Sequence, residues 1–253
     1  VLTGLTPNTR YYYRMQYHAP GDLADDWVNR PEHSFWTQRA EGSGFSFSIT
    51  SDSHVNIMLG SAATWTQTMT NIAGAAPDFE IDLGDTFAMD SVTTAGGADA
   101  AYLYQRQFFD LVGHSTPIFL AAGNHEQQEG WHLDDTGSPP VLSTNAQKKY
   151  YVNPAPDGFY TGDTETVPEL DGDHLREDYY AWTWGDALFV VIDPYWFTTT
   201  KPFTGDMGGG ETSDTGSGIR WDWTLGQTQF NWLRTTLEGS DARYKFVFAH
   251  HMT

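Results

Sequence analysis

The chain has 253 residues, of which 39% are hydrophobic and 15% aromatic, so it can form the core of one large domain, or of one domain and part of another. Its formal net charge of −20 at pH 7 argues against a nucleic-acid or anionic membrane partner, because no basic stripe is available to bind phosphates. The absence of cysteine excludes disulfides, thiolate catalysis and cysteine-ligated zinc. No apolar run approaches the roughly 18 residues of a membrane-spanning helix.

Residues 1–40 differ in character from the rest of the chain. A polar turn leads into a tyrosine-rich strand at 11–15, and a second aromatic run follows at 35–37. The pattern L-x-P-x-T-x-Y that ends at Tyr11 resembles the end of a fibronectin type III-like β-sandwich, in which this residue is the tyrosine corner. We therefore predict that residues 1–40 are the C-terminal part of such a domain, with an ordinary hairpin as the alternative.

Alternating strands and helices follow a short glycine-rich linker at 41–44. Their β-α-β-α-β order predicts a layered α/β domain with right-handed crossovers, which we assign to residues 41–253. The predicted elements of this part are strands at 45–50, 79–83 and 117–121 and helices at 59–72 and 99–111.

A long polar stretch interrupts this alternation. Residues 127–178 are rich in glycine, proline and aspartate, and we interpret them as a loop insertion that borders the active site. Two aromatic strands follow at 179–184 and 187–192, and the Gly-Asp pair between them indicates a tight hairpin. The aromatic run at 195–197 either lines a substrate cleft or packs in the core. A glycine-rich loop is predicted at 198–218.

The last part of the chain combines one helix and one strand. The pattern at 227–237 predicts an amphipathic helix with Phe230, Leu233 and Leu237 on one face. A strand is predicted at 245–249, directly before two consecutive histidines.

Four short motifs with metal-binding side chains follow predicted strands. The carboxyl ends of strands in an open α/β sheet meet at one crevice, so motifs far apart in the sequence can lie together in space. Carboxylate and imidazole groups in this combination suit Mn, Fe or Zn, and one carboxylate can bridge two ions. The motifs are Asp52-Ser53-His54, Gly84-Asp85, Gly123-Asn124-His125-Glu126 and His250-His251.

The order D-x-H, G-D, G-N-H-E, H resembles that of the calcineurin-like metallophosphoesterase superfamily, which includes purple acid phosphatases and cyclic-nucleotide phosphodiesterases. Gln229, Trp232 and Leu233 fit the Q-x-x-W-L arrangement of the same superfamily. The resemblance implies a four-layer α/β/β/α sandwich. The fibronectin-like segment before it resembles the layout of purple acid phosphatases.

The resemblance also implies a ligand set for two metal ions, which would be Fe, Mn or Zn. In that set Asp52 and His54 bind the first ion, Asp85 bridges both ions, and Asn124 and His250 bind the second. The expected reaction is hydrolysis of phosphate mono- or diesters through attack of a hydroxide that bridges the ions.

His125 has a different implied role, because it faces the substrate and protonates or stabilises the leaving oxygen rather than binding metal. The expected partner is a small-molecule phosphate ester. A nucleotide-directed phosphodiesterase or nucleotidase is one alternative. A non-catalytic extracellular binding module, in which the fibronectin-like part is functional, is an alternative of another class.

This sequence departs from the pattern of the relatives in several places. Purple acid phosphatases have a tyrosine at the position of Ala88 and a glycine at that of His54, so a purple iron centre is not expected. Met252 stands where the family usually has proline. The closing G-x-H-x-H motif is absent from these residues, so we expect a truncated sandwich without its C-terminal strands, and weak metal binding. The acidic composition and the fibronectin-like segment favour an extracellular or periplasmic location, and the oligomeric state stays open.

Overall fold

The computed structural model describes residues 2–18, 21, 27–55, 60–89, 91–126, 130–167, 170, 172, 174–200 and 224–251. The predicted loop at 198–218 and Met252 fall almost entirely outside this part of the chain. In chain order the elements are β1 (Arg10–Tyr17), β2 (Val28–Trp36), β3 (Phe47–Thr50), α1 (Ala62–Ala75), β4 (Phe79–Asp82), α2 (Ala95–Gly113), β5 (Ile118–Leu120), the 3-10 turns η1 (Asn124–Glu126) and η2 (Gly130–His132), α3 (Pro139–Tyr150), β6 (Thr161–Gly162), β7 (Tyr180–Trp184), β8 (Ala187–Val191), α4 (Gly226–Glu238) and β9 (Tyr244–Phe248).

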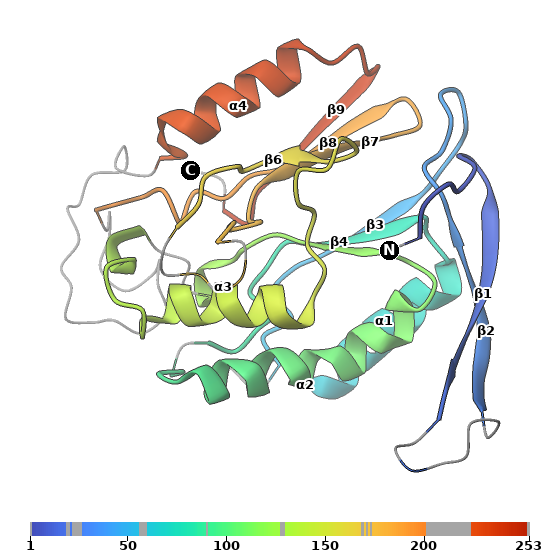
Figure 1. The fold of residues 1–253 in the computed structure, drawn as a ribbon, viewed down its shortest axis with the longest axis horizontal. Coiled ribbons are helices and arrows are strands. Elements are labelled where there is room, and N and C mark those ends of the chain that lie inside the picture. The colour runs from blue at the N-terminus through green and yellow to red at the C-terminus, as the bar shows by residue number, and fades with distance from the viewer. Residues whose placement is uncertain are drawn as a thin grey trace.

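The body of the protein is a sandwich of four layers. One sheet has the parallel order β3-β4-β5, and the other has the order β6-β7-β8-β9. Figure 1 shows the two sheets face to face, with α1, α2 and α3 outside the first and α4 outside the second. This arrangement confirms the predicted α/β/β/α fold class.

Aromatic side chains fill the space between the two sheets. Phe119 stacks on Trp182 with 4.1 Å between ring centroids, and Phe79 meets Phe189 edge to face at 5.0 Å. Each fully buried ring of this kind contributes about 2–3 kcal/mol through removal of apolar surface from water. The alternation of β4 places Phe79 in this layer and turns Glu80 toward the helices.

A second core lies between the parallel sheet and its helices. Trp65, Met69 and Ile72 line the buried face of α1, at the spacing of an amphipathic helix. Ser61 starts this helix because its hydroxyl accepts a hydrogen bond from the amide of Thr64. The helix therefore begins at Ala62 and not at the predicted residue 59, which lies outside the described residues.

The prediction of a loop throughout residues 127–178 is wrong, because α3 occupies the middle of this stretch. The first turn of α3 contains Pro139 and Pro140, and proline is tolerated there because those amides have no partner inside the helix. The buried face of α3 carries the polar residues Ser143, Thr144 and Gln147. The hydrophobic pattern therefore gives no helical signal.

The predicted buried face of α4 is also partly wrong. Leu233 and Leu237 pack against the second sheet as expected, but Phe230 is 50% exposed. Gln229 takes the buried position instead. Its amide donates to the carbonyl of Asp193 (2.8 Å) and its oxygen accepts from the Asp193 amide (3.0 Å). This pairing connects α4 to the loop that follows β8.

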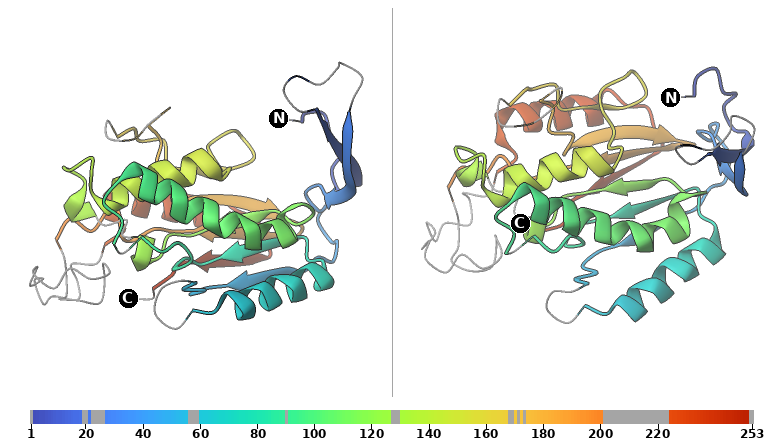
Figure 2. Two further views of the ribbon diagram at one scale, coloured as in Figure 1. Left: turned by 90° about the horizontal axis from the view of Figure 1, so that it is seen from below. Right: turned by 60° about the horizontal axis from the view of Figure 1, so that its bottom comes forward.

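Strands β1 and β2 form an antiparallel hairpin at one end of the layered body (Figure 2). The Tyr11 hydroxyl accepts a hydrogen bond from the amide of Thr6 at 2.8 Å, a contact of the kind that a tyrosine corner makes. The Tyr13 hydroxyl donates to the His114 carbonyl at 2.6 Å and so connects the hairpin to α2. The fibronectin-like assignment and the domain boundary at residue 40 stay predictions.

The hairpin predicted from the Gly-Asp pair is present, since Trp184 pairs with Ala187 in the register of β7 and β8. Strand β9 adds to β8 in parallel and brings His250 to the carboxyl end of these two strands. Among the helices in the described part of the chain, none combines the length and the apolar character needed to cross a membrane.

Candidate metal centre

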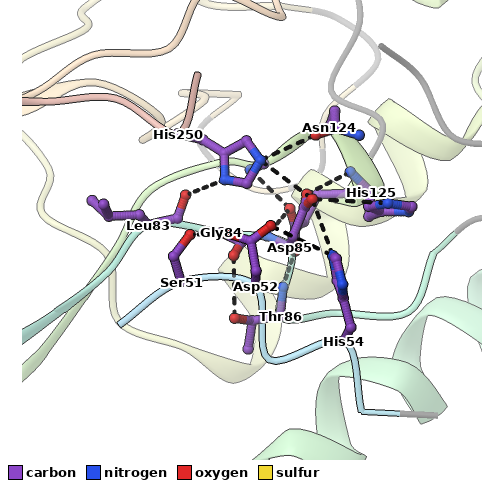
Figure 3. A network of polar contacts seen from close by, with 12 residues as sticks. Ser51, Asp52, His54, Leu83, Gly84, Asp85, Thr86, Asn124, His125 and His250 are labelled. Atoms are coloured by element: carbon purple, nitrogen blue, oxygen red, sulfur yellow. Dashed lines mark hydrogen bonds and ion pairs between the residues drawn. The ribbon is translucent and has the colours of Figure 1, made fainter. Parts of the chain in front are cut away.

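The four motifs meet at the carboxyl ends of β3, β4, β5 and β9, as the sequence predicts (Figure 3). Two backbone hydrogen bonds join the first motif to the second. The amide of Asp52 donates to the carbonyl of Gly84 (2.9 Å), and the amide of His54 donates to that of Asp85 (3.2 Å). The structure thus brings together the six predicted site residues, which are Asp52, His54, Asp85, Asn124, His125 and His250.

Asp85 lies at the centre of this group. Its Oδ2 atom is 3.2 Å from His54 Nε2, 3.2 Å from His250 Nε2 and 3.8 Å from His125 Nε2. The backbone amide of His125 donates to the other oxygen, Oδ1, at 2.8 Å. Asp85 is 3% exposed, so one buried carboxylate contacts histidines from three separate loops.

His250 is held from both sides of its ring. Its Nδ1 atom lies 3.0 Å from the Leu83 carbonyl, and its Nε2 atom lies 3.0 Å from Asn124 Oδ1 as well as 3.2 Å from Asp85. All these partners are acceptors, so the ring satisfies them without an ion only when both nitrogens carry a proton. Burial lowers the pKa of His250, but the hydrogen bond that its ring donates to Asp85 and the charge of that carboxylate outweigh this effect, so the pKa is raised overall.

This arrangement fits a metal ion. His250 Nε2 lies 3.2 Å from a carboxylate oxygen of Asp85 and 3.0 Å from the amide oxygen of Asn124, and these three atoms are of types that bind a cation. A second partner for the ring, here the Leu83 carbonyl on Nδ1, is what fixes the tautomer of metal-binding histidines.

The charge of Asp85 is stabilised by the same contacts. Burial by itself would raise the pKa of this carboxyl group, but the hydrogen bond and charge of His250, with help from His125, lower it to about 2. Asp85 is therefore ionised at neutral pH and ready to bind a cation.

Two groups of candidate ligand atoms share this carboxylate. In one, His54 and His125 accompany Asp85, and in the other, Asp52 and His250 do so. Within each group the atoms lie within 4.8 Å of one another. The sharing agrees with a bridging role for Asp85. The distribution of ligands between two ions, and the role of His125 as a non-ligand, stay predictions.

The backbone is strained at three of the site residues. Asp52, His54 and Asp85 have φ angles of 56°, 45° and 55°, in the left-handed region that residues with a side chain rarely adopt. Each such residue costs about 1–3 kcal/mol and persists only where surrounding contacts fix it. Strain at three clustered candidate ligands is typical of a functional site.

Sequence reasoning left Tyr195 between a substrate cleft and the core, and the structure places its side chain in the core beside the centre. The side chain is fully buried, and its ring centroid lies 5.8 Å from that of His251 and 6.3 Å from that of His250. Burial and then the charge of Asp85 raise the pKa of Tyr195, so the phenol stays protonated beside the centre. Glu126 also received no role from the sequence, although its buried carboxylate accepts a hydrogen bond from the amide of Asp85.

Residues 45–252 match the family model described as calcineurin-like phosphoesterase. The chain therefore belongs to the calcineurin-like phosphoesterase family, in agreement with the resemblance of its motifs. No curated protein is significantly similar to the chain in sequence.

Among solved structures, purple acid phosphatase PPD1 from seeds of yellow lupin (Lupinus luteus) has a similar fold. The TM-score is 0.59 and the sequence identity 15%, over 98% of this chain. The match covers 37% of the lupin chain, so the sequence spans well under half the length of that protein. At this identity the similarity shows the fold alone.

Proposed function

We propose that the chain is the hydrolytic domain of a phosphoesterase that uses two metal ions to cleave small-molecule phosphate mono- or diesters. Family membership supports a metal-dependent phosphoesterase. The observation that carries the dinuclear form is the buried Asp85 carboxylate, which two groups of ligand atoms share.

Each residue of the centre has a task in this proposal. When two ions are bound, Asp52 and His54 would hold one, Asn124 and His250 would hold the other, and Asp85 would contribute to both. Ions of this kind, when bound, activate water and neutralise charge on the phosphoryl group. His125 keeps a partly exposed ring beside the ligands, from which it donates a proton to the leaving oxygen of the substrate.

Hydrolysis by chelator-treated protein, reloaded with Mn²⁺, Zn²⁺ or Fe²⁺, tests this proposal. The substrates are p-nitrophenyl phosphate as a monoester and bis(p-nitrophenyl) phosphate as a diester. We expect metal-dependent hydrolysis of at least one of them. Since loss of a residue that only orients a ligand costs about 10–100-fold, Asp85→Asn should lower the rate by at least about 100-fold.

The control variant is Asp241→Asn, which removes an exposed carboxylate that belongs to none of the four motifs and should leave the rate unchanged. Equal rates for Asp85→Asn and the unmodified chain would contradict the assignment of the bridging ligand. Undiminished hydrolysis in the presence of chelator would contradict metal dependence. An extracellular or periplasmic location is proposed on composition alone, and fractionation of the source cells tests it.

A further inference from the structure

Glu126 is the last residue of η1, directly after the ligand Asn124 and its neighbour His125. The side chain is 1% exposed, and its carboxylate contacts the backbone amides of Asp85 and Thr86. No role followed from the sequence, because a glutamate in a short turn is usually a solvated residue. Its complete burial therefore requires an explanation.

The carboxylate of Glu126 accepts four backbone hydrogen bonds. Oε1 accepts from the amides of Thr86 and Phe87, both at 2.9 Å. Oε2 accepts from the amide of Asp85 at 3.0 Å and from that of Gly123 at 2.8 Å. All four partners are donors, so only an ionised carboxylate, with acceptors at both oxygens, satisfies them together.

The loop that carries Asp85 and the η1 loop are joined by hydrogen bonds in both directions. The Glu126 side chain accepts from the backbone of the loop that carries Asp85, and the Asp85 side chain accepts from the amide of His125 in the η1 loop. Each loop thus supplies the carboxylate that fixes the other. Such charge-assisted bonds are stronger than neutral ones, and burial strengthens them further.

The two loops approach so closely that only glycine fits between them. A Cβ atom on Gly123 would lie 2.3 Å from the Asp85 amide nitrogen, and one on Gly84 would lie 2.3 Å from the Gly123 nitrogen. Asp85 itself is in the left-handed conformation, with φ 55°. The Glu126 carboxylate binds this strained amide directly, so it holds Asp85 in a conformation that the chain would otherwise leave.

We propose that Glu126 is a positioning residue that sets the bridging position of Asp85 without binding metal itself. This inference rests on the proposed function, because the position matters only if Asp85 joins two ions. The loss of a group that orients a ligand typically weakens metal binding about 10–100-fold.

The test uses Glu126→Gln, which keeps the shape of the side chain but places an amide NH₂ where one oxygen accepted two hydrogen bonds. The matched control is Glu80→Gln, the same change at a fully buried carboxyl on β4, which accepts from the Thr50 hydroxyl at 2.7 Å and from none of the loop amides. Mn²⁺ affinity is measured by calorimetric titration of each metal-free protein. Amide exchange in the metal-free state is followed by NMR.

We expect Glu126→Gln to bind Mn²⁺ at least about 10-fold more weakly than the unmodified chain, and Glu80→Gln to bind within about 3-fold of it. In the metal-free protein, the amides of Asp85, Thr86, Phe87 and Gly123 should exchange at least about 10-fold faster in Glu126→Gln, while those of β4 are unchanged. The exchange readout needs no metal, so it tests the loop contacts separately from the proposed function.

Mn²⁺ affinity of Glu126→Gln equal to that of the unmodified chain overturns the positioning role, and so does an equal loss in Glu80→Gln. A third outcome is that the unmodified chain binds no Mn²⁺ while the four amides exchange faster in Glu126→Gln. The loop contacts are then confirmed, but the proposed function fails, and the positioning role fails with it. If Glu126→Gln does not fold, Glu126→Asp replaces it. That variant keeps the charge, but its side chain is one methylene too short to reach all four amides. Its Mn²⁺ affinity and amide exchange are judged by the same criteria as those of Glu126→Gln.

Discussion

Asp82 is a buried acid that is protonated in the folded protein at low pH. Loss of this proton should make the metal-free protein less stable as the pH rises. Its carboxyl group is 0% exposed and accepts from the Thr86 hydroxyl at 2.8 Å and from the Gly84 amide at 3.1 Å. The Thr50 hydroxyl lies 3.1 Å from its other oxygen and 2.7 Å from Glu80. A hydroxyl has one proton and can donate to only one of these acids, so the second contact requires a proton on a carboxyl group.

The magnitude follows from the shift in pKa. Burial raises the pKa of Asp82 from an ordinary value near 4 to about 7. A raised folded-state pKa gives stability that is fully present below the unfolded pKa and is lost as the pH rises through the folded one. About three pKa units at about 1.4 kcal/mol each give a loss of up to about 4 kcal/mol between pH 4 and pH 8.

Asp82→Asn should remove this loss. The Asn oxygen can accept from Thr86 and Gly84, and the NH₂ group can donate to Thr50, so each neighbour keeps its partner. We expect the variant to match the unmodified chain at pH 4 and to exceed its free energy of unfolding by up to about 4 kcal/mol at pH 8. Urea denaturation in the presence of chelator measures this difference, with the exposed Asp241→Asn as control. A difference that stays constant from pH 4 to pH 8 would refute the reasoning.

Three further changes test the packing. Phe189→Ala should lower the free energy of unfolding by about 3–5 kcal/mol in urea, because the ring is fully buried between the sheets; a loss under about 1 kcal/mol contradicts this. Tyr13→Phe removes the hydrogen bond to His114, so amide exchange in the hairpin should rise about 10-fold while that of β4 stays constant. Arg176→Met should cost about 3–5 kcal/mol by thermal or urea unfolding, since Asp163 stays buried without its cation; unchanged stability argues against the pair.

The sequence determined the order of the elements and the chemistry of the site. A strand is predicted at 79–83 with the Gly84-Asp85 pair directly after it, so both β4 and the position of Asp85 at its carboxyl end could be predicted. Parallel strands present their carboxyl ends at one edge, which is why motifs from residue 52 to residue 250 could be expected to meet.

Only the tertiary structure decided features that depend on specific partners. Helix α3 has a polar buried face whose Gln147 and Ser143 lie beside the hydroxyl of Tyr102 on α2, so its local pattern resembles that of a loop. Gln229 replaces Phe230 on the buried face of α4 because a distant backbone at Asp193 offers a donor and an acceptor. In both cases a polar residue is buried because its partner lies far away in the sequence.

The same reason explains why the role of Asp85 could be predicted from the sequence and that of Glu126 could not. Asp85 could be predicted as a ligand, because its motif and its place after a strand are local properties of the sequence. Glu126 accepts hydrogen bonds from a loop about 40 residues earlier, and no local pattern records that contact. Residue types at strand ends determine which atoms are available to a metal, but the close approach of two loops determines where those atoms are held.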